Sequence, residues 1–332
     1  MNQFKALRFH RLGMPAEVLQ LEDVLSTEPG EGEVRIQVHA FALNRADWLY
    51  ANGWHYSQPE LPARIGSECA GIVVATGHGV DPGLLGKSVC TVPFDNCRYG
   101  VQGEFADVPV RYLAPWPKVL TAEQAAAIWM QYLTAYFALL SIARIGPGDH
   151  VLVAAGSSSA GLAAIQLAKH AGATVLATSR SLAKASSIKK AGADHVLSTG
   201  GDTDLAPEIN ALTAGQGIRA VYDPIGGDFM QRYSGALASK ADIFLYGLLS
   251  GEPTKMDLVP LVRAHAIVRP YSMFNHVCEP TELAAAIDYI SKAIDDGVRP
   301  IIDKVFDWPD ALSAYRHMDS HSQVGKIVVK VC

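Results

Sequence analysis

The chain has 332 residues, which corresponds to about two domains at the usual ~150 residues per domain. Its 28 lysines and arginines against 33 aspartates and glutamates give a formal net charge of −5, with 18% charged and 49% hydrophobic residues. This balance argues against a basic nucleic-acid-binding surface and against an intrinsically disordered chain.

The five cysteines are an odd number and include no CxxC pair. They disfavour a disulfide framework or a four-cysteine zinc site, and we expect a protein of the reducing cytoplasm. The amino-terminal segment MNQFKALRFHRLG lacks the uninterrupted apolar core of a signal peptide, so export is not expected.

The first 120 residues show the alternation of half-buried strands, at 34–38, 72–75 and 88–92. Turn sequences such as Glu28-Pro29-Gly30 separate these segments. The pattern predicts a small β-rich domain of barrel type.

An Ala-rich helical region opens near Thr121, and its residues 125–143 carry no formal charge. Nineteen residues is about the length of a membrane-spanning helix. Polar residues such as Gln131 and Ser141 interrupt the stretch, and the rest of the chain has the pattern of a soluble protein. We therefore expect a buried core helix and no membrane partner.

Six short apolar segments then recur at steps of 21 to 25 residues, which leaves room for one helix in each crossover. They begin near Val151, Thr174, His195, Ala220, Ile243 and Ile267. This spacing predicts an α/β fold with a doubly wound, mainly parallel sheet. A helix over 281–296 and a last strand over 326–331 follow, and we expect this tail to return to the first domain.

The first of these segments ends in a turn of small residues that opens a helix, comprising Gly156, Ser157, Ser158, Ser159, Ala160 and Gly161. Small side chains let backbone amides approach a pyrophosphate at the amino terminus of a helix. Two glycines of the dinucleotide fingerprint are present, and Ser158 replaces the middle one. Its position on the first strand of the array predicts cofactor binding.

The second strand ends in Ser179 and Arg180, with Lys184 shortly after, where an NAD-binding site carries an acidic residue. A carboxylate would repel a 2′-phosphate, whereas these basic and hydroxyl groups can bind one. The alternative is a solvated basic turn. We expect NADP, with NADPH preferred over NADH.

The chain resembles the zinc-independent quinone oxidoreductases of the medium-chain dehydrogenase/reductase superfamily, the zinc-type alcohol dehydrogenase-like proteins, from near its first residue to its last. Besides the serine-rich turn, the matching motifs are Asn44-Arg45-Ala46-Asp47, Gly66-Ser67-Glu68-Cys69-Ala70-Gly71, Leu133-Thr134-Ala135-Tyr136, Gly192-Ala193-Asp194-His195-Val196, Asp223-Pro224-Ile225-Gly226-Gly227, Tyr246-Gly247 and Gly325-Lys326.

The resemblance implies a GroES-like catalytic domain over 1–121 and 275–332, with a Rossmann domain over 122–274. It also implies a homodimer that pairs the last Rossmann strand, near Ile267 and Val268. Zinc-dependent relatives place ligands where this chain has Asn44, Ser67 and the pair Met130-Gln131, which together are poor zinc ligands. The lobe that holds structural zinc in those relatives is missing, since residues 92–105 contain only Cys97.

Without zinc to polarise an alcohol, the expected reaction is hydride transfer from NADPH to a quinone or an α,β-unsaturated carbonyl compound. Candidate proton donors are Tyr50 and Tyr56, although each can equally be a packing or cleft-lining residue. Asn44 is the expected polar contact beside the nicotinamide or the substrate, and a turn-forming asparagine is the alternative.

Further cofactor contacts are expected from residues that follow the predicted strands or belong to the family motifs: Thr134, Tyr246, Gly247, Leu248, Phe274, Asn275, Gly325 and Lys326. Each has a structural alternative, such as a helix-interior threonine, a core phenylalanine or a bulge at Gly325. Asp223 is expected to cap a turn and not to act as a base, because proline follows it.

Two other functions are kept open. Gly156 to Ala160 approximates the GxSxG motif of a serine hydrolase, which would use Ser158 with a histidine such as His265 or His276. A non-catalytic NADPH-binding protein of the same fold is the second alternative.

Overall fold

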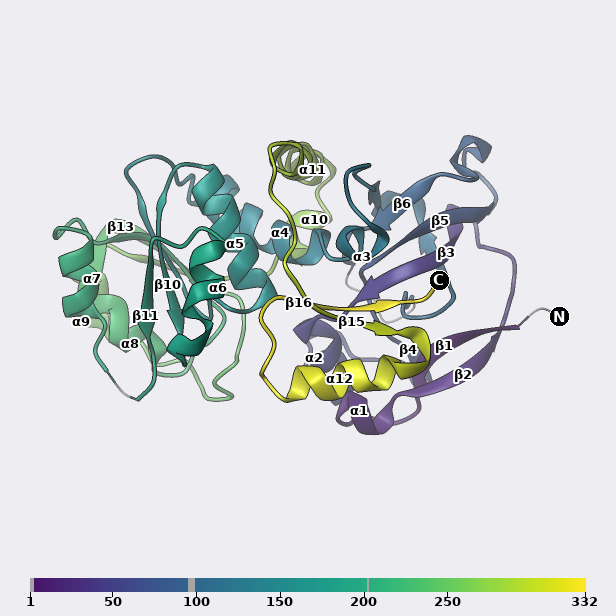
Figure 1. Ribbon diagram of the computed structural model, residues 1–332, viewed down its shortest axis with the longest axis horizontal. Coiled ribbons are helices and arrows are strands. Elements are labelled where there is room, and N and C mark those ends of the chain that lie inside the picture. The colour runs from purple at the N-terminus through teal and green to yellow at the C-terminus, as the bar shows by residue number, and fades with distance from the viewer. Residues whose placement is uncertain (1–2, 95–98, 202) are drawn as a thin grey trace. The chain divides into compact units, whose positions relative to one another are not determined.

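The structure, a computed structural model, describes residues 3–94, 99–201 and 203–332 (Figure 1). The chain forms two compact units: residues 1–130 with 299–332, and residues 131–298. Both boundaries of the second unit lie later in the chain than those of the predicted Rossmann domain, 122–274. Helix α11 (Pro280–Asp295) belongs to the second unit because Tyr289 packs on Tyr136, with ring centroids 5.4 Å apart, and its hydroxyl bonds to His170 at 2.9 Å.

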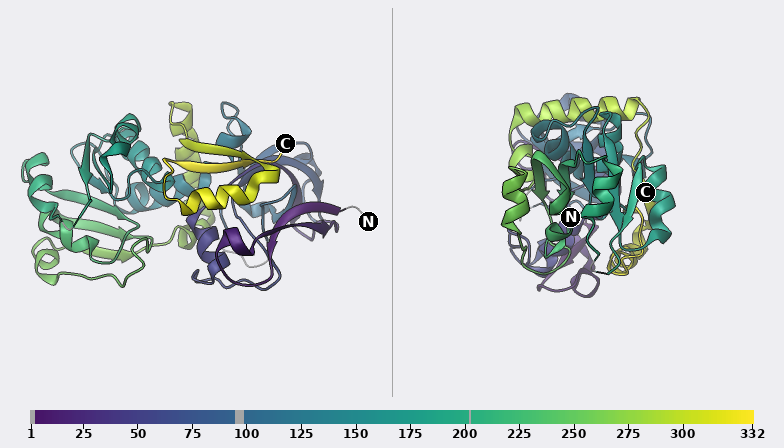
Figure 2. Two further views of the ribbon diagram at one scale, coloured as in Figure 1. Left: turned by 60° about the horizontal axis from the view of Figure 1, so that its bottom comes forward. Right: turned by 90° about the vertical axis from the view of Figure 1, so that its left-hand side faces the viewer.

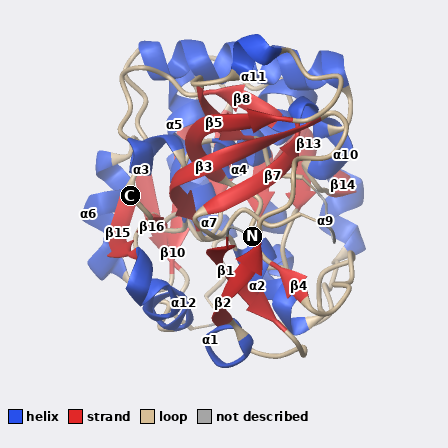
Figure 3. Cartoon of the chain, turned by 90° about the vertical axis from the view of Figure 1, so that its right-hand side faces the viewer, coloured by secondary structure: helices blue, strands red, loops and turns tan. Residues whose placement is uncertain are grey.

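The first unit consists mainly of β-sheet (Figure 3). Its strands are β1 (Gln3–Phe9), β2 (Gln20–Leu25), β3 (Glu33–Ala42), β4 (Ala63–Arg64), β5 (Cys69–Thr76), β6 (Ser88–Thr91), β7 (Phe105–Pro109), β8 (Leu113–Pro115), β15 (Ile302–Asp307) and β16 (Lys326–Lys330). One sheet has the order β2-β1-β4, and the other has the order β15-β16-β3-β5-β6-β8, with β7 also paired to β3.

The predicted tail returns to this unit only from residue 299 onward, because its helix α11 belongs to the second unit. Strand β16 pairs antiparallel with β3, so that Val328 lies opposite Ala42. Figures 1 and 2 show this tail, drawn in yellow, with the purple amino-terminal strands. The pairing brings Lys326, at the start of β16, close to the residues that follow β3.

The second unit contains the six-stranded parallel sheet that the spacing predicts. Its strands are β9 (His150–Val153), β10 (Thr174–Ser179), β11 (His195–Ser198), β12 (Ile218–Asp223), β13 (Leu237–Leu245) and β14 (Ile267–Pro270), in the order β11-β10-β9-β12-β13-β14. The order reverses between β9 and β12, and ligands of such sheets bind outside the carboxyl ends of the strands at that point.

Helices connect these strands and cover the sheets. In the first unit they are α1 (Pro15–Val18), α2 (Arg45–Asn52), η1 (Pro82–Leu84), η2 (Val110–Tyr112), α3 (Ala122–Ala125), η6 (Trp308–Asp310) and α12 (Ala311–Asp319). The second unit has α4 (Trp129–Ala135, whose first two residues belong to the first unit), η3 (Tyr136–Ile142), α5 (Ser159–His170), η4 (Leu182–Lys184), α6 (Ala185–Lys190), α7 (Ala206–Leu212), α8 (Phe229–Tyr233), η5 (Ser234–Ala236), α9 (Leu258–Arg263), α10 (Phe274–Val277) and α11.

The uncharged stretch forms a helical run from Ala122 to Ile142 that is long and apolar enough to cross a membrane. However, 78% of its most apolar window is buried inside the protein, as expected for a core helix. Its last part, η3, is a π-helix. Buried side chains such as Trp129, Tyr132 and Phe137 explain the composition of the stretch.

Candidate functional site

The small-residue turn joins β9 to α5 at the carboxyl edge of the parallel sheet. Gly156 and Gly161 are needed for close packing, because a Cβ at Gly156 would lie 2.9 Å from the Ala177 side chain and one at Gly161 would lie 2.6 Å from the Ala155 carbonyl oxygen. Ala155 has a φ of 50°, a left-handed conformation that the sequence did not reveal. The turn presents the amino terminus of the twelve-residue α5 to an anion.

Ser158 caps α5, since its Oγ accepts a hydrogen bond from the Gly161 N–H at 3.0 Å. Helix capping alone accounts for a serine at this position, and no nucleophilic role is needed to explain it. Of the two histidines named for a hydrolase, His276 pairs with Glu282 at 2.6 Å and His265 is exposed after α9. The structure therefore adds no support to the hydrolase alternative.

The basic turn follows β10, the strand next to β9. Ser179 ends β10, and its hydroxyl donates to the Ser181 carbonyl at 2.9 Å. Arg180 is exposed directly after it, and Lys184 ends the short helix η4. No acidic residue lies between Thr174 and Lys184. The geometry offers a 2′-phosphate a guanidinium at the carboxyl edge of the sheet.

Two loops at the ends of β12 and β13 are joined by backbone hydrogen bonds. Asp223, fully buried at the end of β12, accepts the Ile225 N–H at 2.7 Å and the Tyr233 hydroxyl at 3.2 Å. Burial raises the pKa of Asp223 to about 6. These bonds make Asp223 a turn-capping acid, as predicted.

The β13 loop carries Tyr246, Gly247 and Leu248. Its Leu249 N–H donates to the Pro224 carbonyl at 2.9 Å, which holds it against the β12 loop. The Tyr246 ring stacks on Tyr222 at 4.1 Å, whereas Leu248 is 67% exposed. Leu248 is therefore available to a ligand, whereas the Tyr246 ring packs on Tyr222 and supports the loop.

Thr134 and Phe274 belong to helices beside the end of β14. Thr134 in α4 is buried, and its hydroxyl lies 3.2 Å from the Met273 sulfur. Its carbonyl accepts the Tyr271 hydroxyl at 2.8 Å. Phe274, followed by Asn275, begins α10 and is half-buried. Both predicted contacts lie in the second unit, and their contact with a cofactor stays a prediction.

In the first unit, Asn44 and Lys326 are brought together although they lie 282 residues apart in the chain. The Lys326 ammonium donates to Asn44 Oδ1 and forms an ion pair with Glu68 Oε2 at 2.8 Å. Asn44 Nδ2 donates to the same Glu68 oxygen at 3.2 Å. Lys326 is thus buried and bound, not exposed as a contact for an anion.

Gly325 takes a φ of +106°, and a Cβ there would lie 2.4 Å from the Ile301 carbonyl oxygen. The glycine therefore shapes the entry to β16, in line with its structural alternative.

Asp47 and Glu68 are acids in this cluster to which the sequence reasoning gave no role. Asp47 accepts the Asn44 backbone N–H at 2.9 Å and the Gln102 side-chain amide at 3.4 Å. Burial raises the pKa of Asp47 to about 7, against the opposing effects of the Asn44 N–H and the Lys326 ammonium. Glu68 directly precedes the largely apolar segment 69–76, and an acid at such a position is a sequence signal for a buried partner.

The two candidate tyrosines differ in exposure. Tyr50, in α2, is 8% exposed and packs edge-to-face on Phe9 at 5.9 Å. Tyr56 lies in the loop after α2, is 61% exposed and stacks on His55 at 4.2 Å. Only Tyr56 presents much of its ring to an incoming molecule.

At the positions of the expected zinc ligands, the Asn44 side chain already has partners within the protein. The Asn44 carboxamide is occupied by Lys326 and Glu68, and burial raises the pKa of the Cys69 thiol nearby to about 12, so that it stays protonated. Throughout residues 3–94, 99–201 and 203–332, no group of three or more histidine, cysteine, aspartate or glutamate side chains could hold a metal ion. Cys97 lies outside the described residues.

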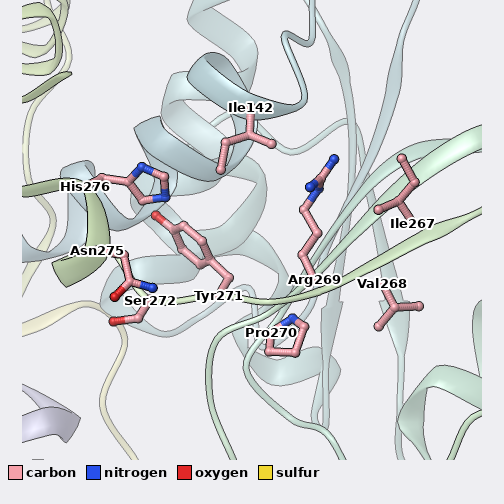
Figure 4. Close-up of a pocket in the computed structure, with 9 residues that line it drawn as sticks. All are labelled: Ile142, Ile267, Val268, Arg269, Pro270, Tyr271, Ser272, Asn275 and His276. Carbon is pink, nitrogen blue, oxygen red and sulfur yellow. The ribbon is translucent and has the colours of Figure 1, made fainter. Parts of the chain in front are cut away.

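A cavity of about 410 Å³ lies beside β14 (Figure 4). It is lined by Ile142, Ile267, Val268, Arg269, Pro270, Tyr271, Ser272, Asn275 and His276. Of the predicted cofactor contacts, only Asn275 is among them. The cavity therefore lies at the β14 edge of the sheet and is not lined by the phosphate-binding turn.

Two family models match the chain. The model described as "Alcohol dehydrogenase GroES-like domain" matches residues 30–132, and the model described as "Zinc-binding dehydrogenase" matches residues 160–292. Among curated proteins, quinone oxidoreductase 1 of Escherichia coli (strain K12) is 29% identical over 96% of this chain and 97% of its own length. A 2-haloacrylate reductase of a Burkholderia species is 27% identical over 96% and 97%.

Solved structures agree with these matches over the whole chain. A mycobacterial protein complexed with NADPH has a TM-score of 0.89 and 29% identity, covering 99% of this chain and 100% of that one. The E. coli quinone oxidoreductase complexed with NADPH has a TM-score of 0.87 and 28% identity, covering 98% and 100%. Both units of the chain are therefore similar to proteins solved with the same dinucleotide.

Proposed function

We propose that this member of the zinc-type alcohol dehydrogenase-like, medium-chain dehydrogenase/reductase superfamily is a metal-free reductase. The chain is an NADP-dependent oxidoreductase. The proposed acceptors are quinones or α,β-unsaturated carbonyl compounds. The observation that carries this proposal is the turn from β9 to α5 beside a basic turn after β10, at the point where the strand order reverses. Bound NADPH supplies a hydride to an electron-poor acceptor.

The residues of the second unit bind and orient the dinucleotide. The amides between Gly156 and Gly161 receive its pyrophosphate at the amino terminus of α5. Arg180, assisted by Ser179 and Lys184, receives the 2′-phosphate. The other expected contacts with the cofactor are Thr134, Gly247, Leu248, Phe274 and Asn275, while Tyr246 supports the loop that carries Gly247 and Leu248.

The residues of the first unit serve the acceptor. Asn44 contributes a polar contact to the acceptor oxygen or the nicotinamide, where an oriented dipole stabilises developing charge. Tyr56 is the better candidate for delivering a proton, because it is far more exposed than Tyr50. The names of the relatives support this acceptor class, since one is a quinone oxidoreductase and one reduces a 2-haloacrylate.

The absence of metal is part of the proposal, although one matching family model is described as zinc-binding. The residues at the expected position do not fit zinc: an asparagine and a serine replace the ligands, and Lys326 brings a positive charge to the Asn44 oxygen. Such a cation and a divalent metal repel each other. The reaction therefore needs an acceptor that is reactive without a Lewis acid.

We also propose a homodimer formed through β14. This strand ends the order of the six-stranded sheet. Apolar side chains of β14 and of α9, the helix that precedes it in the chain, are exposed, including Ile267 at 44%, Val259 at 57% and Val262 at 69%. A second copy that pairs with β14 would cover this surface. The four cysteines among the described residues are free, which supports the reducing cytoplasm as the location.

The proposed reaction is tested by following NADPH absorbance while quinones, enones and enoyl thioesters are added in turn, with NADH compared side by side. We expect NADPH oxidation with at least one class, at a higher kcat/KM than with NADH. Tight NADPH binding without oxidation across the whole panel would leave the non-catalytic binding protein instead.

A further inference from the structure

The first unit contains a buried ion pair between Lys326 and Glu68. Both side chains are fully buried, and Nζ lies 2.8 Å from Oε2. The other carboxylate oxygen, Oε1, accepts the Met130 backbone N–H at 2.9 Å. Both oxygens of Glu68 therefore have donors, and the negative charge is fixed in place.

Such a pair contributes little to stability compared with apolar side chains of the same size. Removing two charges from water is costly, and buried ion pairs can often be replaced by hydrophobic residues without loss of stability. Stability alone thus gives no reason to keep Lys326 and Glu68 inside the protein. A reason has to come from what else the pair contacts.

The third member of the cluster is Asn44. Its Oδ1 accepts from the Lys326 ammonium, and its Nδ2 donates to Glu68 at 3.2 Å. A carboxamide can sit in two orientations of nearly the same shape. The reverse orientation would turn the NH₂ group toward the ammonium and the oxygen toward the carboxylate. The ion pair therefore favours one orientation over the other.

We propose that Lys326 is a positioning residue for the reductase reaction, and that together with Glu68 it holds the Asn44 carboxamide in its single working orientation. The inference rests on the proposed function, in which Asn44 contacts the nicotinamide or the acceptor. Orientation decides whether that contact offers a donor or an acceptor of hydrogen bonds, and an oxygen that gains negative charge needs a donor.

The test is a pair of variants that neutralises both charges, Lys326→Met with Glu68→Gln. Glu68→Gln keeps an oxygen for the Met130 N–H, and its new amide can donate to Asn44, so the electrostatic preference disappears. We expect kcat to fall about tenfold, with the KM for NADPH changed less than about twofold. In an Asn44→Ala background the same double change should cause no further loss of kcat.

A matched control neutralises a partly exposed pair in the second unit, Lys169→Met with Asp194→Asn. The Lys169 Nζ and Asp194 Oδ1 atoms lie 3.0 Å apart. Neither residue is near Asn44 or Tyr56 in the sequence, and neither is proposed to contact the acceptor, so kcat should not change. If the Lys326/Glu68 variant does not fold, Lys326→Met with Glu68→Leu replaces it, and the same loss is expected. Additive losses of kcat in the Asn44→Ala background would overturn the proposal.

A second measurement does not depend on turnover. In protein labelled with ¹⁵N at asparagine, the Asn44 side-chain amide is identified by its loss in Asn44→Ala. We expect two separate proton signals that exchange slowly with water in the wild type, and shifted, faster-exchanging signals in the double variant. Unchanged signals would overturn the positioning role. A wild type that reduces no acceptor refutes the proposed function, while this spectrum still decides the orientation of Asn44.

Discussion

Stability should fall as the pH rises because Asp47 holds its proton more tightly in the folded protein than in the unfolded chain. Burial raises its pKa from 3.8 to about 7. A raised carboxyl pKa contributes stability that is complete below the unfolded value and is lost as the pH rises through the folded value. The difference between the two pKa values corresponds to about 4 kcal/mol in all, of which about 3 kcal/mol falls between pH 5 and pH 8.

The matched variant is Asp47→Asn, which keeps an oxygen for the Asn44 N–H and removes the titration. All five tryptophans lie in residues 1–130 and 299–332, so their fluorescence in urea reports the unfolding of the first unit. We expect the wild-type free energy of unfolding to drop by about 3 kcal/mol from pH 5 to pH 8 relative to the variant. If the free energy of unfolding changes with pH in the same way in both proteins, Asp47 does not hold a proton in the folded state.

The other predictions concern the cofactor, the turn and the dimer. Arg180→Asp should weaken NADPH binding about 10- to 100-fold and NADH binding less than about threefold in a fluorescence titration, and equal effects would argue against the 2′-phosphate contact. Ser158→Ala should cost about 1 kcal/mol of stability in a urea melt through the lost cap, and a fluorophosphonate should leave wild-type Ser158 unlabelled; labelling would favour a hydrolase. Val262→Glu should convert a dimer to a monomer on size-exclusion chromatography, whereas Leu85→Glu, an exposed apolar site in the first unit, should not; a dimer that survives Val262→Glu would contradict pairing through β14.

The parallel sheet could be predicted because its signals are local: an apolar strand, a turn and a helix repeat at a nearly constant step. The boundary that was least visible is the start of β13. This strand begins at Leu237, six residues before the predicted Ile243, and its Ser239 and Lys240 are exposed. Its pairing with β12 is irregular there, between Ile218 and Ala220. Exposed polar residues near the start of a strand do not show the alternation of a half-buried strand.

The candidate site likewise has a part that local sequence patterns predict and a part that they do not. The turn from β9 to α5 and the basic turn after β10 are contiguous in sequence, so residue types and spacing were enough to predict them. The Asn44 cluster is not contiguous, since Glu68 lies 24 residues from Asn44 and Lys326 lies 282 residues away. Only the pairing of β16 with β3 brings Lys326 there, and no local pattern encodes it. Burial likewise separated Tyr50 from Tyr56, which the sequence could not rank by exposure.

Hydride transfer itself is the central claim, and isotope transfer measures it most directly. NADPH deuterated at the transferable position of its nicotinamide is mixed with the protein and an enone that the acceptor screen identifies, and the product is analysed by mass spectrometry and NMR. We expect one deuterium at the β-carbon of the reduced enone, and a slower reaction than with unlabelled NADPH if hydride transfer limits the rate. NADPH oxidation that leaves the deuterium off the product carbon would contradict it.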